Sequence, residues 1–170
     1  PGTGLGAAVS AGQRCTTTRR LIVHESIHDN VLATLVKAYK QLDSKIGDPT
    51  DPANLMGPLN SRGAVEQFLE SIAKAKAAGG TVEVGGTAID RPGNFVLPAI
   101  VTGLKNSDAV VQHETFAPIL HVMKYSTLDE AIDLQNGVPQ GLSSSIFTQN
   151  LKAAEKFLSP LIVDPKACLL

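Results

Sequence analysis

Short apolar runs alternate along this chain with longer stretches in which apolar residues recur every three or four positions. Runs of the first kind are typical of buried strands, and stretches of the second kind are typical of amphipathic helices. A chain that alternates the two kinds packs helices onto a sheet, so the pattern predicts an α/β fold. The length of 170 residues fits a single domain.

Apolar composition and turn residues locate the expected strands. The runs that predict strands are residues 19–25, 81–84, 95–104, 119–125 and 141–148. Pro98 lies inside the third run and indicates an edge strand or a bulge, because proline cannot donate a ladder hydrogen bond. Residues 107–118 are expected to form a short helical turn that runs into a loop.

Helical spacing and capping residues locate the expected helices. These helices are residues 27–42, 61–80, 128–137 and 150–158. Ser26 and Thr127 are the expected N-caps of the first and third, because their hydroxyl groups can accept a free backbone N–H. Residues 46–61 hold several prolines and glycines, which predicts a long irregular connection between the first two helices.

Charge and aromatic content exclude several classes of partner. The chain has 15 Lys and Arg against 16 Asp and Glu, a net charge of −1, and it has no tryptophan. We therefore expect no nucleic-acid partner. No apolar run approaches the ~20 residues that span a bilayer, so no membrane partner is expected. Two cysteines at opposite ends of the chain cannot build a disulfide framework, which favours a cytoplasmic location.

The two ends of the chain differ in composition from its middle. Residues 1–10 are rich in small residues, and residues 160–170 are apolar and carry two prolines. We interpret the first segment as an irregular or truncated edge, residues 11–159 as the α/β domain, and the last segment as a separate tail. Glycines at positions 2, 4 and 6 lack the preceding strand of a dinucleotide-binding fingerprint, so a flexible linker is expected there.

Cys15 is the strongest candidate for chemistry. It follows Arg14 and precedes Arg19 and Arg20 in a polar segment, GQRCTTTRR. Nearby positive charge makes a thiol more nucleophilic, whereas an inert cysteine more often lies in an apolar run, as Cys168 does.

The segment HESIH, residues 24–28, has the H-E-x-x-H spelling of a zinc-protease helix. Such a site needs both histidines on one face of one helix. The pattern places His24 at the end of a strand and His28 in the following helix, so we expect no metal site.

Glu114 lies in the expected loop before Phe116 and Pro118. A loop carboxylate is usually only solvated, but in dinucleotide-binding folds such groups accept the hydroxyls of a cofactor ribose. His113 beside it is a possible general base without a visible partner. A cysteine hydrolase remains a weaker alternative, since it would need a histidine bonded to Cys15.

Five separated motifs resemble those of the NAD(P)-dependent aldehyde dehydrogenases. They are GQRCTT at residues 12–17, GDP and GPL at 47–49 and 57–59, GNFVLPAIV at 93–101, ETFAPIL at 114–120 and GLSSSIFT at 141–148. Their order and spacing agree from about Ala11 to Ser159. The resemblance implies a catalytic domain of three layers, with a mostly parallel sheet flanked by helices.

The resemblance also implies a role for each candidate residue. Cys15 would attack an aldehyde, forming a thiohemiacetal and, after hydride transfer to NAD, a thioester. The cofactor-binding residues would be Glu114, which accepts the nicotinamide-ribose hydroxyls, and Phe116, which packs near the nicotinamide. Arg14 and Thr16 would bind the substrate. Cys15 and Glu114 should therefore open onto the same face.

Arg14 before the cysteine, the threonines after it, and the segments ETFAPIL (114–120) and PQGLSSSIFT (139–148) resemble the α-aminoadipic semialdehyde (antiquitin) branch of that family. The resemblance implies oxidation of this semialdehyde in lysine degradation, and a homo-oligomer, dimer or tetramer, in the full-length enzyme. The cofactor domain that precedes the cysteine in the family is absent here, and residues 160–170 match no family segment. We therefore expect these residues alone to be inactive. The alternative is a non-catalytic α/β fragment that serves assembly or binding.

Overall fold

The computed structural model describes residues 6–159. Most of the N-terminal glycine stretch, Cys168 and the rest of the tail 160–170 lie outside the described residues.

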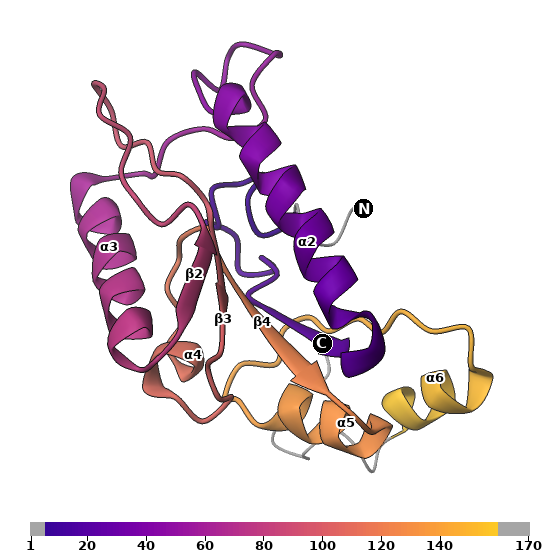
Figure 1. Ribbon diagram of the computed structural model, residues 1–170. Coiled ribbons are helices and arrows are strands. Elements are labelled where there is room, and N and C mark those ends of the chain that lie inside the picture. The colour runs from indigo at the N-terminus through magenta and orange to yellow at the C-terminus, as the bar shows by residue number, and fades with distance from the viewer. Residues whose placement is uncertain (1–5, 160–170) are drawn as a thin grey trace.

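The described chain folds around a four-stranded sheet (Figure 1). Its elements are, in chain order, β1 (Arg20–His24), α2 (Glu25–Leu42), the 3-10 helix η1 (Asp43–Lys45), α3 (Arg62–Ala77), β2 (Thr81–Val84), β3 (Ala99–Thr102), α4 (Ala109–Gln112), β4 (Ile119–Tyr125), α5 (Leu128–Asn136) and α6 (Leu151–Leu158). The predicted alternation of strands and helices is therefore confirmed for most of the chain.

The strands lie in the order β1-β4-β3-β2. Two pairings are parallel: β1 with β4, from Arg20 opposite His121 to His24 opposite Tyr125, and β3 with β4. Only β2 pairs antiparallel, with β3. Parallel neighbours require crossovers, which the long excursion between β1 and β4 and the short α4 between β3 and β4 supply. The α/β fold with a mostly parallel sheet is confirmed.

Helices flank the sheet on either side in Figure 1, with α3 next to β2 and α2 next to β1 and β4. Apolar side chains from the strands and from these helices form one core. Its largest fully buried members are Tyr39, Phe68, Met56, Leu59, Ile100 and Leu120. Burying a large apolar side chain contributes about 1.5–3 kcal/mol, so this cluster is the main stabilising element of the fold.

Helix α2 begins two residues earlier than predicted. Its N-cap is His24, whose ring Nδ1 accepts the N–H of Ser26 at 3.2 Å and contacts the Ser26 hydroxyl at 2.8 Å. The same ring packs edge-on against Tyr125, with ring centroids 5.2 Å apart. The prediction of Ser26 as N-cap was wrong because the histidine side chain takes that function. The predicted cap Thr127 is confirmed, since it accepts the N–H of Glu130.

The predictions for Pro98 need one correction. Strand β3 begins directly after Pro98 and lies between β4 and β2, so it is not an edge strand. The irregularity lies in the partner, where the register of β2 shifts between Val82 and Val84. Pro98 is accommodated because the ladder starts at the next residue, where Ala99 donates to Pro118.

The predicted strand at residues 141–148 is absent from the structure. Leu142 is 55% exposed and Phe147 is 76% exposed, so the apolar side chains of this segment find little cover. A strand forms only when a neighbour pairs with its backbone, and local alternation alone cannot supply one. Three consecutive serines, residues 143–145, also give this segment little apolar area to bury.

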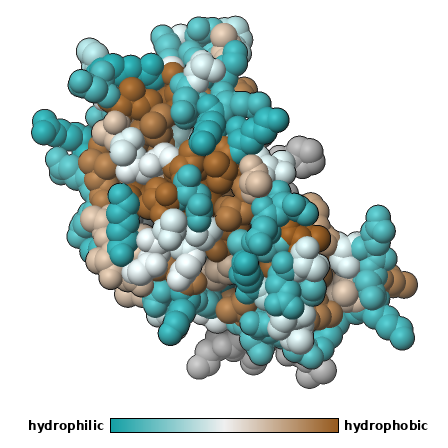
Figure 2. Space-filling model, in the orientation of Figure 1, coloured by the Kyte–Doolittle hydropathy of each residue, from teal (hydrophilic) through white to brown (hydrophobic). Residues whose placement is uncertain are grey.

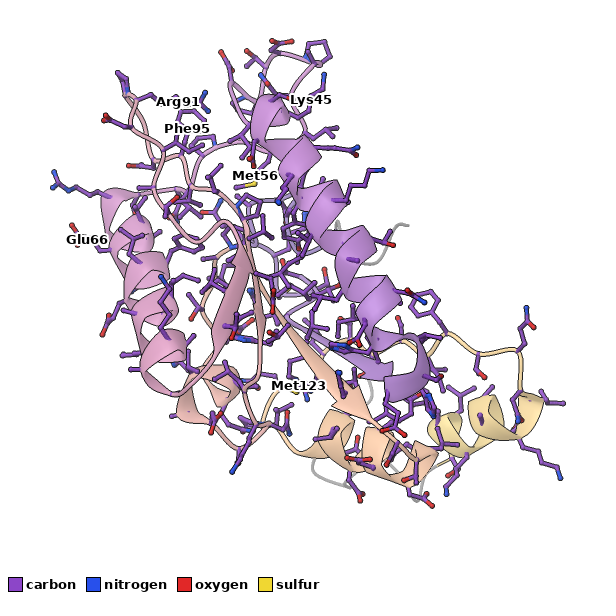
Figure 3. The ribbon with its side chains drawn as sticks, in the orientation of Figure 1. Lys45, Met56, Glu66, Arg91, Phe95 and Met123 are labelled. Atoms are coloured by element: carbon purple, nitrogen blue, oxygen red, sulfur yellow. The ribbon has the colours of Figure 1, made fainter. Side chains whose placement is uncertain are left out.

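A long loop between β2 and β3 is fastened to the sheet and to the connection after α2. The guanidinium of Arg91 stacks on the ring of Phe95 at 3.9 Å from its centroid and donates to the carbonyl of Ile46 at 2.8 Å (Figure 3). Buried Met56 belongs to the same connection and pairs with Ile46 through an isolated β-bridge. These contacts give the irregular connection 46–61 a fixed position.

Figure 2 shows apolar residues gathered between α3 and α2 on one face of the molecule, interrupted by polar side chains. Within residues 6–159, no helix combines the length and the apolar character that a membrane crossing requires.

One buried histidine makes the stability of this fold depend on pH. His121 on β4 is 7% exposed, and its Nδ1 has no hydrogen-bond partner among the described residues. Burial, together with the positive charges of Arg20 and Arg19, lowers the pKa of His121 from 6.5 to about 4. Between these two values the unfolded chain binds a proton that the folded chain does not. Stability is therefore complete above pH 6.5 and falls as the pH is lowered towards 4.

We predict that His121→Leu makes the free energy of unfolding less dependent on pH below pH 6.5. The free energy of unfolding from urea titrations should fall between pH 6.5 and pH 4 by about 3 kcal/mol less in the variant than in the wild type. His113→Gln, which removes an exposed histidine, is the matched control and should follow the wild type. Equal slopes for wild type and His121→Leu would show that the buried ring is not the titrating group.

Candidate active site

Cys15 lies at the tip of a tight turn directly before β1. The N–H of Thr17 donates to the carbonyl of Arg14 at 3.1 Å, and the N–H of Arg14 donates back to the Thr17 hydroxyl at 3.1 Å. Thr17 is buried by this arrangement, while Arg14, Cys15 and Thr16 are exposed. The turn therefore presents the thiol and its two neighbours outward from a fixed backbone. We call residues 12–17 the nucleophile loop.

Gln13 fastens the nucleophile loop to the irregular connection that follows α2. Its side-chain Nε2 donates to the carbonyl of Pro58 at 3.3 Å, and its Oε1 accepts the N–H of Asn60 at 2.8 Å. Both polar atoms of one amide are thus used across a large sequence separation. The GPL segment at residues 57–59 serves the site by holding this loop.

Gly12 allows the nucleophile loop to touch the loop before β4. Both Ala11 and Gly12 have left-handed backbones, with φ of 52° and 69°. A Cβ on Gly12 would lie 2.1 Å from the carbonyl carbon of Ala117 and 2.5 Å from the nitrogen of Pro118. Only glycine fits such an approach of two backbones.

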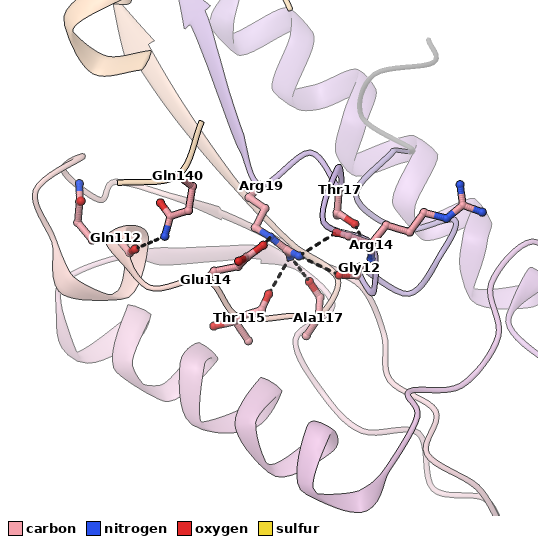
Figure 4. Close-up of polar contacts among 9 residues, drawn as sticks. All are labelled: Gly12, Arg14, Thr17, Arg19, Gln112, Glu114, Thr115, Ala117 and Gln140. Carbon is pink, nitrogen blue, oxygen red and sulfur yellow. Dashed lines mark hydrogen bonds and ion pairs between the residues drawn. The ribbon is translucent and has the colours of Figure 1, made fainter. Parts of the chain in front are cut away.

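Arg19 bonds to both loops at once (Figure 4). Its Nη2 donates to the carbonyls of Gly12 and Arg14, at 3.1 and 3.3 Å. Its Nη1 donates to the carbonyls of Thr115 and Ala117, at 2.8 and 3.4 Å. The guanidinium therefore occupies the junction between the nucleophile loop and residues 114–117, which we call the glutamate loop.

The Glu114 carboxylate completes this junction. Its Oε1 accepts a hydrogen bond from Arg19 Nε at 3.2 Å, and within residues 6–159 this is the only hydrogen bond that it accepts. Phe116 is 43% exposed, and its ring centroid lies 5.0 Å from the Arg19 guanidinium carbon. One carboxylate oxygen is thus oriented by Arg19, and the second remains available to a ligand.

Burial and charge act on Arg19 in opposite directions. Burial lowers the pKa of the Arg19 guanidinium, whereas the charge of Glu114 and the hydrogen bond to it raise that pKa. An arginine stays protonated under these conditions, so the junction keeps its positive charge. A separate hydrogen bond holds the glutamate loop to α3, since the hydroxyls of Thr115 and Ser71 lie 2.7 Å apart.

A cavity of about 920 Å³ brings the main candidate residues together. Cys15, Thr16 and Glu114 line it, with Arg19 between them. Cys15 and Glu114 therefore open onto the same face, as expected. Arg14 and Phe116 are exposed but do not line this cavity. Beyond Glu114 the cavity continues along the outer edge of β1 and reaches residues 140–147.

The two histidines of the HESIH segment, residues 24–28, have separate structural functions. His24 caps α2, while the His28 ring is buried and its Nδ1 lies 2.8 Å from Asp29 Oδ1. Among the described residues, no group of three or more His, Cys, Asp or Glu side chains is arranged to hold a metal ion.

Three residues that shape this site are not among the candidates that the sequence pattern indicates. Gly12, Gln13 and Arg19 all act on partners that lie far along the chain. Arg19 was noted only as a charge near Cys15, although its bonds reach Glu114. The sole local signal for Gly12 was the glycine itself, which often marks a close backbone approach.

Known proteins resemble this chain over nearly its whole length. The sequence model of a protein family described as "Aldehyde dehydrogenase family" matches residues 2–163 of this chain. The putative aldehyde dehydrogenase family 7 member A1 homolog of Caenorhabditis elegans is 54% identical over 160 residues, which cover 94% of this chain and 30% of that protein. The alpha-aminoadipic semialdehyde dehydrogenase of Bos taurus is 51% identical over 154 residues, covering 91% of this chain and 28% of that protein.

Comparison with solved structures indicates the same family as the sequence comparison. Aldehyde dehydrogenase from Bacillus cereus superposes with a TM-score of 0.87 at 30% identity, over 92% of this chain and 31% of that one. Betaine aldehyde dehydrogenase from Staphylococcus aureus in complex with NAD+ superposes with a TM-score of 0.86 at 31% identity, over 91% of this chain and 31% of that one. The chain thus spans roughly three-tenths of the length of these proteins.

We predict that Gly12→Ala separates the two loops. The new methyl group must displace the Ala117–Pro118 backbone, so unfolding free energy should fall by more than about 3 kcal/mol in urea titrations. Gly79→Ala is the matched control, because Gly79 has φ of 91° but nothing within 4 Å of an added Cβ. It should lose only the left-handed backbone penalty of about 1–2 kcal/mol. Equal losses would mean that the close approach at Gly12 carries no energy.

Proposed function

Because the chain belongs to the aldehyde dehydrogenase family, we propose that it carries the nucleophile of an enzyme that oxidises an aldehyde to a carboxylic acid with NAD+. The observation that supports this most directly is the shared cavity: Cys15 and Glu114 are far apart in sequence and line one space. A thiol suits attack on the aldehyde carbon, and a carboxylate beside it suits the hydroxyls of a cofactor.

The residues around Glu114 fit one end of such a cofactor. Its free carboxylate oxygen would accept the hydroxyls of the nicotinamide ribose, with the carboxylate held in place by Arg19. The exposed ring of Phe116 would pack near the nicotinamide. When bound, NAD+ supplies a hydride acceptor for the aldehyde carbon. The complex of the Staphylococcus aureus relative with NAD+ supports this choice of cofactor.

Cys15 would act as the nucleophile. Its sulfur forms a bond to the aldehyde carbon, giving a thiohemiacetal, and its backbone N–H donates to the oxygen that becomes negative. Transfer of hydride from that carbon to bound NAD+ would leave a thioester. Water then adds to the thioester carbon, the C–S bond breaks, and the acid and the free thiol are released. The tight turn between Arg14 and Thr17 holds the Cys15 backbone for these steps.

The substrate we propose is α-aminoadipic semialdehyde, an intermediate of lysine degradation. Its support is the identity of about half the residues to proteins that bear this name. Arg14 is exposed directly beside Cys15, and its guanidinium suits the carboxylate of such a substrate. Thr16 lines the cavity on the other side of the thiol.

We assign the nucleophile-bearing domain to residues 11–159. In the full-length enzyme we propose a homo-oligomer in the cytoplasm, where a thiol such as Cys15 is kept reduced. The chain covers 28–30% of the length of its curated relatives, and the activity that we propose is that of the full-length enzyme. We propose that the 170-residue polypeptide does not turn over by itself.

A second candidate function is assembly or binding without catalysis. Exposed apolar side chains on and before α6 favour it: Phe147, Leu151 and Leu158 are each more than 70% exposed. Under this alternative we expect the Cys15 thiol to be alkylated no faster than an ordinary thiol. The reactivity of Cys15 therefore separates the two functions.

We predict that iodoacetamide labels native Cys15 several-fold faster than it labels glutathione at neutral pH. Arg14 stands directly beside the exposed thiol in sequence, and the ordered turn of the nucleophile loop holds the thiol outward, so attack on the reagent is favoured. Peptide mapping after timed quenching gives the rate at Cys15 separately from Cys168. Protein unfolded in urea is the control and should label at the rate of glutathione. A native rate no faster than that would favour the non-catalytic function.

We also predict that the 170-residue polypeptide forms no NADH from NAD+ and α-aminoadipic semialdehyde above the level of a Cys15→Ser variant. NADH absorbance over time provides the measurement. Production of NADH by the wild type but not by Cys15→Ser would refute the proposed inactivity, while it would support the assigned nucleophile.

A further inference from the structure

Arg19 is bonded differently from the arginine that follows it. Arg20 donates to the side chain of Asn106 and to the carbonyls of Leu134 and Gln135 in the last turn of α5. Within the described residues, the Arg19 side chain makes all of its hydrogen bonds to the nucleophile loop and the glutamate loop. Two adjacent, half-buried arginines thus serve separate parts of the molecule.

The division of its donors makes Arg19 a connector. Nη2 bonds only carbonyls of the nucleophile loop, Nη1 bonds only carbonyls of the glutamate loop, and Nε bonds Glu114 itself. The guanidinium is planar and its donors keep fixed directions, so a shift of one loop must turn the group or break bonds to the other. The ring of Phe116 against the guanidinium limits that rotation further.

Other contacts leave little freedom for the loops to move apart. The Arg19 side chain is only 18% exposed. The backbone of Gly12, whose carbonyl Arg19 bonds, lies against the backbone of Ala117 and Pro118. Loss of the guanidinium would leave the buried Gly12 carbonyl without a donor among the described residues, which costs free energy unless the loops rearrange. The carbonyls of Arg14, Thr115 and Ala117 would each lose one of two donors. The position of Cys15 therefore depends on a group that also holds Glu114.

We propose that Arg19 is a positioning residue that couples the Glu114 carboxylate to the reactivity of Cys15. The meaning of this coupling for catalysis rests on the proposed function, in which Glu114 binds the cofactor. A ligand that engages Glu114 pulls on the same guanidinium that fixes the turn carrying the thiol. Cys15 then senses the state of the cofactor site through one side chain, without contact between the two groups.

A double-mutant cycle on the intact chain tests the coupling without any ligand. The readout is the second-order rate of Cys15 alkylation by iodoacetamide, measured by peptide mapping from about pH 6 to about pH 9, below the thermal midpoint of every variant. The variants are Arg19→Gln, Glu114→Gln and the double variant. Arg20→Lys is the matched control, because Arg20 has similar burial and no bond to either loop.

We expect each single variant to slow alkylation at least about threefold at neutral pH, and the double variant to be no slower than Arg19→Gln. Arg20→Lys should keep the wild-type rate. Arg19→Lys should behave like Arg19→Gln, because one ammonium group cannot bond the carbonyls of both loops. If Arg19→Gln does not fold, Arg19→Lys with and without Glu114→Gln completes the cycle.

Three results would overturn the proposal. The first is an unchanged or raised alkylation rate in Arg19→Gln with only the thermal midpoint lowered, which is what a purely structural residue would give. The second is a double variant whose loss is the product of the two single losses. The third is full rescue by lysine, which would leave charge alone as the function of Arg19.

A calorimetric titration of the same variants with NAD+ separates this proposal from the proposed function. Binding by the wild type that weakens in both Arg19→Gln and Glu114→Gln supports the two together. A non-additive alkylation cycle in a protein that binds no NAD+ supports the coupling and counts against the cofactor site. Additive losses of alkylation rate in a protein that binds NAD+ count against the coupling and support the cofactor site.

Discussion

The parallel pairing of β1 with β4 decides where the chemistry of this molecule lies. Parallel neighbours begin at the same edge of a sheet, so the segments that precede them are brought together. The nucleophile loop precedes β1 and the glutamate loop precedes β4. Ligands of open α/β sheets usually bind beyond the carboxyl ends of the strands. Here the candidate residues gather at the amino ends, because the loops that enter these two strands carry them.

Direct contact between the two entering loops follows from that pairing. Gly12 permits the backbones to touch, and Arg19 satisfies carbonyl groups of both loops that the contact removes from water. Neither device is sufficient alone, since a close approach without the guanidinium would leave the buried Gly12 carbonyl without a donor among the described residues. Sheet register, a glycine and one guanidinium together define the position of a thiol and a carboxylate.

Most of the fold was predictable because its signals are local. Strand β4 and the cap of α5 at Thr127 follow from apolar runs and hydroxyl groups that act within a few residues. The segment 141–148 failed because a strand also needs a partner that its own residues do not encode. At the site, Cys15 and Glu114 stood out by residue type and by resemblance. Arg19 did not, since its partners lie in a loop that only the folded sheet brings near.

Strand β1 has one further consequence for handling the protein. In the part of the chain that the structure describes, it is one of the two end strands of the sheet, and its outer edge faces the cavity rather than another strand. Backbone groups on such an edge are free to pair with an extended segment of a second molecule. Pairing at this edge in concentrated solutions would cover the strand that follows the nucleophile loop and would close the cavity that Cys15 lines.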